Sequence, residues 1–166
     1  VKSNSYFTEE EIKGGLAIDE IGDGNINFVY RVKALTTARS LIVKQATSSF
    51  RTDPSGKLSP DRIGFEVGSL MKIGEINPGQ VPEIYHYDDK RKAFIMEDCI
   101  DYSILRADLM DEKTFPNFGK EIGLFLARLH FYTSDFYLSG DEKKDLTASY
   151  INPDLCEITE RLVFTE

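Results

Sequence analysis

The sequence predicts an α+β fold, in which about five antiparallel strands and one inserted helix are followed only by helices. Residues 18–46 and 81–97 are rich in β-branched and aromatic residues between turn signals, which is typical of strands. Residues 60–73, between them, place apolar side chains at helical spacing. After Tyr102 the strand signals fade and helical periodicity takes over. The change of composition near Cys99–Asp101 therefore predicts two parts, residues 1–98 and residues 99–166.

Each expected element has a local reason. Thr8 is expected to cap a short helical turn, because Glu11 stands three residues later, as in a capping box. Glycine, proline and aspartate residues separate the segments that follow. These segments are strands at 18–33 and 39–46, a helix at 60–73, strands at 81–87 and 92–97, and helices at 118–129, 141–150 and 153–161.

Composition excludes several classes of protein. The 166 residues are 41% hydrophobic and 29% charged, which is ordinary for a soluble globular protein. The net charge of −8 makes nucleic acid a poor partner, because an acidic surface repels a phosphate backbone. No apolar run reaches the roughly 18 residues that span a bilayer, so no membrane segment is expected. The cysteines, Cys99 and Cys156, have no metal-ligand spacing and indicate no disulfide framework, so we expect a cytoplasmic location and no metal site.

A glycine-bearing turn, Gly22-Asp23-Gly24-Asn25, joins the first two strand signals and leads to Asn27. Glycine lets the backbone approach a ligand closely, and successive N–H groups in such a turn can face phosphate oxygens. Asp-Gly and Asn-Gly pairs are also common in ordinary hairpins. The turn by itself therefore indicates phosphate binding only weakly.

Lys44 and Glu66 strengthen the phosphate-binding interpretation. Lys44 follows three apolar residues on a strand, 20 residues after Gly24, which places it beneath the glycine turn. Glu66 borders the apolar face of the next helix, where a carboxylate needs a cation. This order of turn, strand lysine and helix glutamate is typical of kinase-like folds, in which the lysine holds nucleotide phosphates. The alternative interpretation is a solvent-facing lysine and a surface glutamate.

The segment Met96-Glu97-Asp98-Cys99 ends an apolar strand abruptly in two acids. In kinase-like folds the segment at this place offers backbone groups to adenine. Here the carbonyl of Glu97 and the N–H of Cys99 would serve, with Met96 lining the pocket. An ordinary strand end is the alternative interpretation.

With these residues assembled, the chain resembles the 5-methylthioribose kinases, within the aminoglycoside phosphotransferase and choline kinase group. The segments that carry the resemblance are Glu20–Asn27, Ile42–Gln45, Asp61-Arg62 with Glu66, Val81-Pro82 with Tyr85, Met96–Asp98, Phe131–Asp135 and Asn152–Thr165. The resemblance implies a protein-kinase-like amino-terminal lobe for residues 1–98. For residues 99–166 it implies the hinge and the first helices of an incomplete carboxy-terminal lobe.

The resemblance also implies a ligand and a reaction. The family transfers the γ-phosphate of ATP to the 1-hydroxyl of 5-methylthioribose in methionine salvage, and Asn27, Lys44 and Glu97–Cys99 match its ATP contacts. The residues expected to bind ATP are Gly22, Asp23, Gly24, Asn25, Asn27, Lys44, Glu66, Met96, Glu97, Asp98 and Cys99. A homodimer is implied by the resemblance alone.

The chain departs from the family in what it lacks. The family's catalytic aspartate, in a His-Gly-Asp loop, and its magnesium-binding Asp-x-Glu motif have no counterpart, and His130 and Asp135 are too far apart to replace the loop. We therefore expect an amino-terminal portion of a longer enzyme, with the Mg²⁺ ligands elsewhere and no turnover by this portion alone. Two alternatives stay open. One is a kinase of the same group acting on choline, homoserine or an aminoglycoside, and the other is a non-catalytic nucleotide-binding truncation or pseudokinase.

Overall fold

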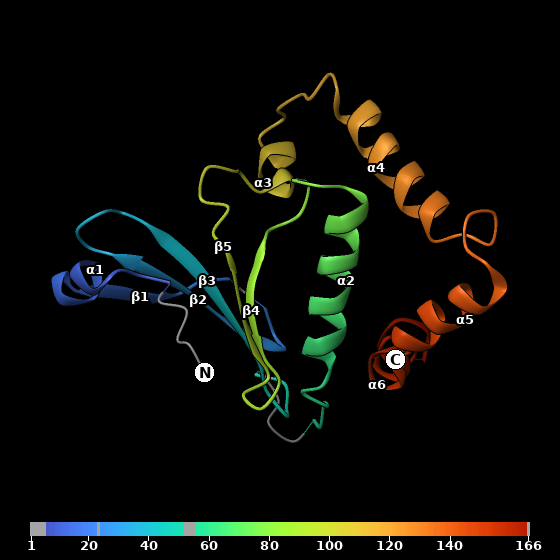
Figure 1. Cartoon of the computed structure of the whole chain (residues 1–166), viewed down its shortest axis with the longest axis horizontal. Coiled ribbons are helices and arrows are strands. Elements are labelled where there is room, and N and C mark those ends of the chain that lie inside the picture. Colours follow the sequence, from blue (N-terminus) through green and yellow to red (C-terminus); the bar gives the residue numbers. More distant parts are fainter. Residues whose placement is uncertain (1–5, 23, 52–55, 166) are drawn as a thin grey trace. The chain divides into compact units, whose positions relative to one another are not determined.

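The computed structural model describes residues 6–22, 24–51 and 56–165 (Figure 1). The chain forms two compact units. The first is made of residues 1–67, 84–98 and 152–166, and the second of residues 68–83 and 99–151. The division after residue 98 that the sequence suggests stays a prediction.

The first unit contains the sheet. Its elements are α1 (Glu9–Gly14), β1 (Leu16–Glu20), β2 (Asn27–Ala34), β3 (Ser40–Ala46), β4 (Ile84–Asp88), β5 (Ala93–Glu97), α6 (Pro153–Glu160) and a π-helical turn, η1 (Arg161–Thr165). Helix α2 (Arg62–Ile76) begins in this unit and ends in the second one. The strand order is β1-β2-β3-β5-β4, and every neighbouring pair is antiparallel. The predicted α+β fold with a five-stranded antiparallel sheet is confirmed.

The two faces of the sheet bury different clusters, because side chains alternate along each strand. On one face, Ile42 of β3 is 5% exposed and Phe94 of β5 is 0% exposed. Ile63 and Val67 of α2 are buried as well, at 0% and 4% exposed. The other face holds a cluster around Phe7, Ala34 and Leu41, to which Tyr6, Val32, Val43 and Ile95 add partly buried surface. The sheet therefore has a core on each side, and α2 supplies part of one of them.

Several predicted boundaries move, each for a local reason. The predicted glycine turn divides the span 18–33 into β1 and β2, and β1 begins two residues earlier than predicted, at Leu16, directly after the Gly15 that caps α1. Strand β4 begins at Ile84 rather than Val81, since Pro82 has no N–H for a ladder bond. The capping box at Thr8 is confirmed: its hydroxyl accepts from the N–H of Glu11 at 3.2 Å, and its own N–H donates to the Glu11 carboxylate at 2.7 Å.

The second unit is helical. Its elements are the end of α2, α3 (Leu105–Met110), α4 (Phe118–Tyr132) and α5 (Gly140–Ser149). The sequence did not predict α3, whose six residues are too few to show a helical period. The hydroxyl of Tyr150 donates to the carbonyl of Gly68 at 2.9 Å, and the Asn77 amide donates to the carbonyl of Phe125 at 3.3 Å. These bonds fix α2 to the two later helices.

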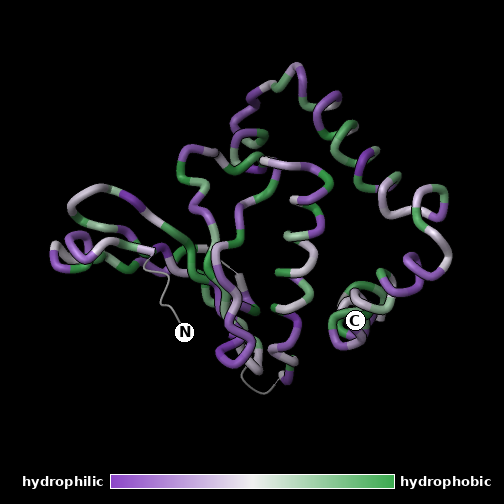
Figure 2. The backbone as a smooth tube through the Cα atoms, in the orientation of Figure 1, coloured by the Kyte–Doolittle hydropathy of each residue, from purple (hydrophilic) through white to green (hydrophobic). Residues whose placement is uncertain are grey.

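Helix α4 keeps much of its predicted apolar stripe in solvent. Phe118, Ile122 and Leu126 are 45%, 38% and 42% exposed. Figure 2 shows hydrophobic and hydrophilic residues alternating along this helix. Across the described ranges, no helix is both long and apolar enough to cross a membrane.

Candidate functional site

The turn between β1 and β2, residues 21–26, carries the two glycines of the predicted site. Gly22 has a φ of +87°, a left-handed conformation that other residues rarely adopt, so the backbone itself requires glycine there. Asn25 is exposed, and Asp23 lies outside the described residues.

Lys44 lies in the middle of the sheet, opposite Val29 of β2 and Phe94 of β5. Its Nζ donates to Oε1 of Glu66 on the first turns of α2, at 2.5 Å. The two side chains are 22% and 33% exposed. The predicted ion pair is therefore confirmed, and it is partly shielded while still open to a ligand. Such a pair orients the ammonium without hiding it.

Asn27, the first residue of β2, is 7% exposed. Its Oδ1 accepts a hydrogen bond from Nη2 of Arg62 at 2.8 Å. Arg62 opens α2 and is 4% exposed. Burial lowers the pKa of the Arg62 guanidinium, and the negative charge of Glu66 opposes this. The end of the glycine turn is thus tied directly to the helix that carries Glu66.

Asp98, directly after β5, is held by its side chain inside the first unit. Its carboxylate accepts from Nε and Nη2 of Arg31 at 2.7 and 3.0 Å and from the Ser40 hydroxyl at 2.6 Å, and it is 3% exposed. Burial raises the pKa of this carboxyl, but the Arg31 and Ser40 hydrogen bonds and the Arg31 charge outweigh burial and hold the pKa below its usual value. The side chain of Asp98 therefore faces Arg31 and Ser40, and only its backbone remains for a ligand.

The other members of this segment differ in exposure. Met96 is partly buried and pairs in register with Ile42, whereas Glu97 and Cys99 are exposed. Because the predicted contacts to adenine are made by backbone atoms, these exposures do not decide them. Binding of ATP by these residues stays a prediction.

Arg51 reaches the glycine turn from the loop after β3. Its backbone N–H donates to the carbonyl of Asn25 at 2.8 Å and its Nη1 to the carbonyl of Gly24 at 3.2 Å. Its Nη2 pairs with the carboxylate of Glu20, and its guanidinium carbon lies 4.5 Å from the centre of the Phe28 ring. One arginine thereby binds both ends of the turn.

Sequence reasoning gave no structural role to the three arginines that organise this region, Arg31, Arg51 and Arg62, although Arg62 belongs to a segment that carries the family resemblance. A signal exists for one of them. Arg62 stands at the amino-terminal end of a helix, where the helix dipole disfavours a cation. A cation at that place needs other partners, which only the fold identifies.

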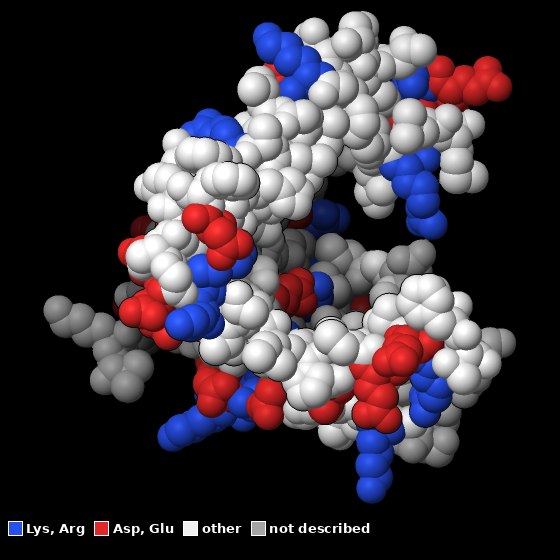
Figure 3. Space-filling model, turned by 90° about the vertical axis from the view of Figure 1, so that its right-hand side faces the viewer, with Lys and Arg blue, Asp and Glu red and all other residues white. Residues whose placement is uncertain are grey.

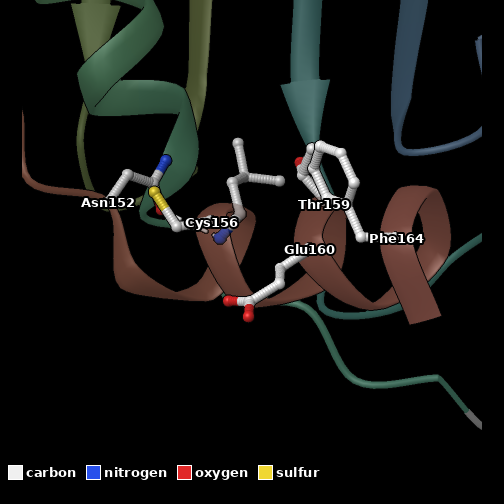
Figure 4. Close-up of a pocket in the computed structure, with 6 residues that line it drawn as sticks. Asn152, Cys156, Thr159, Glu160 and Phe164 are labelled. Atoms are coloured by element: carbon white, nitrogen blue, oxygen red, sulfur yellow. Dashed lines mark hydrogen bonds between the residues drawn. The ribbon is translucent and has the colours of Figure 1, made fainter.

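A shallow hollow of about 710 Å³ lies along α6 and η1 (Figure 4). It is lined by Asn152, Leu155, Cys156, Thr159, Glu160 and Phe164. Asn152 is already occupied as the helix cap, since its Oδ1 accepts from the N–H of Leu155 at 3.4 Å. The described residues that line the hollow include no set of charged groups that would select a ligand.

Charged side chains of both signs lie on the surface outside the site. Figure 3 shows acidic and basic side chains interspersed on the face that it presents. Within the described ranges, no three His, Cys, Asp or Glu side chains gather as ligands for a metal ion.

Comparison with known proteins connects this geometry to a family. The chain is 41% identical over 152 residues to a protein named methylthioribose kinase from Geobacillus sp. (strain WCH70), which covers 91% of this chain and 38% of that relative. It is 38% identical over 166 residues to the protein of the same name from Bacillus cereus (strain B4264), covering 99% of this chain and 41% of the relative. The chain is homologous to methylthioribose kinases.

A third methylthioribose kinase, from Geobacillus kaustophilus (strain HTA426), is 40% identical over 152 residues. The chain spans 38–41% of the length of these methylthioribose kinases. No family model matches the chain. The homology covers the whole described site of the first unit, including the glycine turn, Lys44, Glu66 and Asp98.

Proposed function

We propose that the complete protein is a kinase that transfers the γ-phosphate of ATP to the 1-hydroxyl of 5-methylthioribose, and that this chain supplies its ATP-binding part. The observation that carries the proposal is the ion pair at 2.5 Å between Glu66 of α2 and Lys44 of β3, the strand that pairs with β2 after the glycine turn. The names of the homologous proteins support the choice of acceptor.

The residues of the first unit suit the binding of a triphosphate. Phosphoryl transfer depends mostly on positioning and on neutralising charge, and Lys44 offers an oriented cation. Gly22 lets the turn adopt a backbone conformation in which N–H groups can approach phosphate oxygens. The segment at Glu97–Cys99 offers backbone groups for adenine, and the buried carboxylate of Asp98 anchors that segment.

Mg²⁺ is proposed as the partner of ATP in the complete protein. It would neutralise charge on the phosphates as the bond to the γ-phosphate breaks. The described residues present no cluster of carboxylates or histidines for it, so its ligands are assigned to parts of the protein outside this chain. The homodimer and the cytoplasmic location likewise belong to the proposal for the complete protein.

The test is an ATP-dependent phosphorylation assay on the complete gene product, with 5-methylthioribose beside choline, homoserine and an aminoglycoside. Turnover with 5-methylthioribose alone supports the proposal. Turnover with another acceptor replaces the substrate and keeps the ATP site. Binding of ATP without transfer to any acceptor leaves the non-catalytic alternative.

A further inference from the structure

Arg62 makes an unusual set of contacts for a buried cation. Its Nη1 donates to the carbonyls of Thr47 and Ser59, at 2.7 and 2.8 Å. Its Nη2 donates to the carbonyl of Ile26 and to Oδ1 of Asn27. All four acceptors are neutral oxygens, and they come from three separate segments of the chain.

These bonds offset the cost of burying the charge. A buried guanidinium is tolerated when its donors are satisfied, and four of them are used here. Among the described residues, the buried Nε of Arg62 has no hydrogen-bond partner, so the site is not an arrangement that maximises stability alone. Glu66 lies one helical turn further along and acts on Arg62 through its charge rather than through a hydrogen bond.

The contact with Asn27 has a chemical consequence. A carboxamide has an acceptor oxygen and a donor nitrogen. Because Arg62 only donates, the atom of the Asn27 amide that faces the guanidinium must be the oxygen. With Oδ1 facing the guanidinium, Nδ2 is the end that remains for another group. Among the described residues, Nδ2 of Asn27 donates to none. Asn27 therefore offers an N–H₂ donor beside the glycine turn, which is the polarity that an anionic phosphate oxygen requires.

We propose that Arg62 is a positioning residue for nucleotide binding, which orients the Asn27 amide so that Nδ2 donates to a phosphate oxygen of ATP. The inference rests on the proposed function, because it assigns ATP to this site. It adds a residue that need not touch the nucleotide itself. It also explains why a cation stands at the amino-terminal end of α2, where the dipole disfavours it.

The first experiment is Asn27→Asp in the complete protein, without nucleotide. A carboxylate at this place faces the guanidinium of Arg62 and forms an ion pair, so the melting temperature is expected to stay the same or rise. The matched control is Asn77→Asp. Asn77 is also buried, at 1% exposed, but its Oδ1 has no partner among the described residues. A carboxylate there is uncompensated and is expected to lower the melting temperature by about 5 °C or more.

The second measurement is binding of ATP and of adenosine by calorimetry. Asn27→Asp replaces the donor by an acceptor, so ATP affinity is expected to fall at least about tenfold while adenosine affinity is retained. Arg62→Lys keeps a cation but cannot hold the amide and three carbonyls together. It is expected to lower ATP affinity in the same selective way and, combined with Asn27→Asp, to recover thermal stability through a Lys–Asp pair.

Opposite results overturn the inference. If Asn27→Asp lowers the melting temperature as much as Asn77→Asp does, the guanidinium does not face Oδ1. If Arg62→Lys binds ATP as the wild-type protein does, or if the wild-type protein binds no ATP, Arg62 has no role in nucleotide binding. If Arg62→Lys does not fold, the two asparagine variants decide. A protein that binds ATP but phosphorylates no acceptor contradicts the proposed function and leaves these readouts intact.

Discussion

Asp98 and Arg31 form a two-bond ion pair, with Nε and Nη2 of the guanidinium 2.7 and 3.0 Å from the two carboxylate oxygens. Arg31 comes from β2 and Asp98 from the end of β5, while β3 lies between these strands in the sheet. The Ser40 hydroxyl of β3 completes the cluster. Together, Arg31, Ser40 and Asp98 therefore link β2, β3 and β5 at the point where the chain leaves the sheet.

Asp98→Asn is expected to destabilise the complete protein by about 2–3 kcal/mol, because it removes the charge from a carboxylate that is 3% exposed and accepts hydrogen bonds from Arg31 and Ser40. The measurement is urea unfolding followed by circular dichroism. The matched control is Asp141→Asn, which removes an exposed ion pair with Lys144, 95% and 80% exposed, and is expected to change stability by less than about 0.5 kcal/mol. Equal effects of the two substitutions would contradict the structural role of Asp98.

The same carboxylate makes stability depend on pH. Its pKa is lower in the folded protein than in the unfolded chain, so its contribution is present above the unfolded value of about 4 and is lost as the pH falls through the folded value. The difference in unfolding free energy between wild type and Asp98→Asn is therefore expected to be constant from pH 7 to 5 and to shrink below about pH 4. A difference that grows in acid would mean that the folded-state pKa is raised instead.

Lys44→Ala is expected to lower turnover of the complete enzyme by about tenfold to a thousandfold, because a positioned charge on the phosphates is lost. Glu66→Gln is expected to act in the same direction through Lys44, so the double variant should be little worse than Lys44→Ala. The control is Lys13→Ala, whose lysine forms an exposed ion pair with Glu9. The measurement is steady-state kinetics at varied ATP concentration. If the effects of the two single substitutions on turnover add fully in the double variant, Lys44 and Glu66 act separately.

Arg51→Ala is expected to raise the KM for ATP by about three- to tenfold with a smaller change in kcat, because the glycine turn loses the contacts at Gly24 and Glu20 that hold it in shape. Arg91→Ala is the matched control, since Arg91 pairs with Asp88 in an exposed hairpin. If Arg51 instead contacts phosphate directly, Glu20→Gln will release the Arg51 guanidinium from its ion pair and will tighten ATP binding. If Arg51 braces the turn, Glu20→Gln will weaken ATP binding.

The residues that were predictable from the sequence are those whose partners lie nearby or follow a strong pattern. The pairing of Lys44 with Glu66 could be inferred because a strand lysine and a helix glutamate in that order have one common arrangement. Gly22 was singled out, and its φ of +87° gives the reason.

Other contacts depend on strand register, which local patterns do not specify. Asp98 was expected only as a member of the segment that binds ATP, and the sequence did not indicate that its side chain is bound to Arg31, 67 residues earlier in the chain. Arg51 and Arg62 bind backbone carbonyl groups. Every residue type has such a group, so these contacts cannot be inferred from the sequence. The role of Asn27 as an ATP ligand stays a prediction, now with a defined orientation of its amide.

The strand order leaves β1 and β4 as the outer strands of the sheet, and each carries a feature that discourages pairing with another molecule. β1 ends in two carboxylates, Asp19 and Glu20, and β4 has an irregular register between Ile84 and His86. Aggregation of the isolated chain through sheet extension is thereby opposed. The apolar surface that α4 exposes at Phe118, Ile122 and Leu126 is then the part of the chain to shield during purification, by polar substitutions.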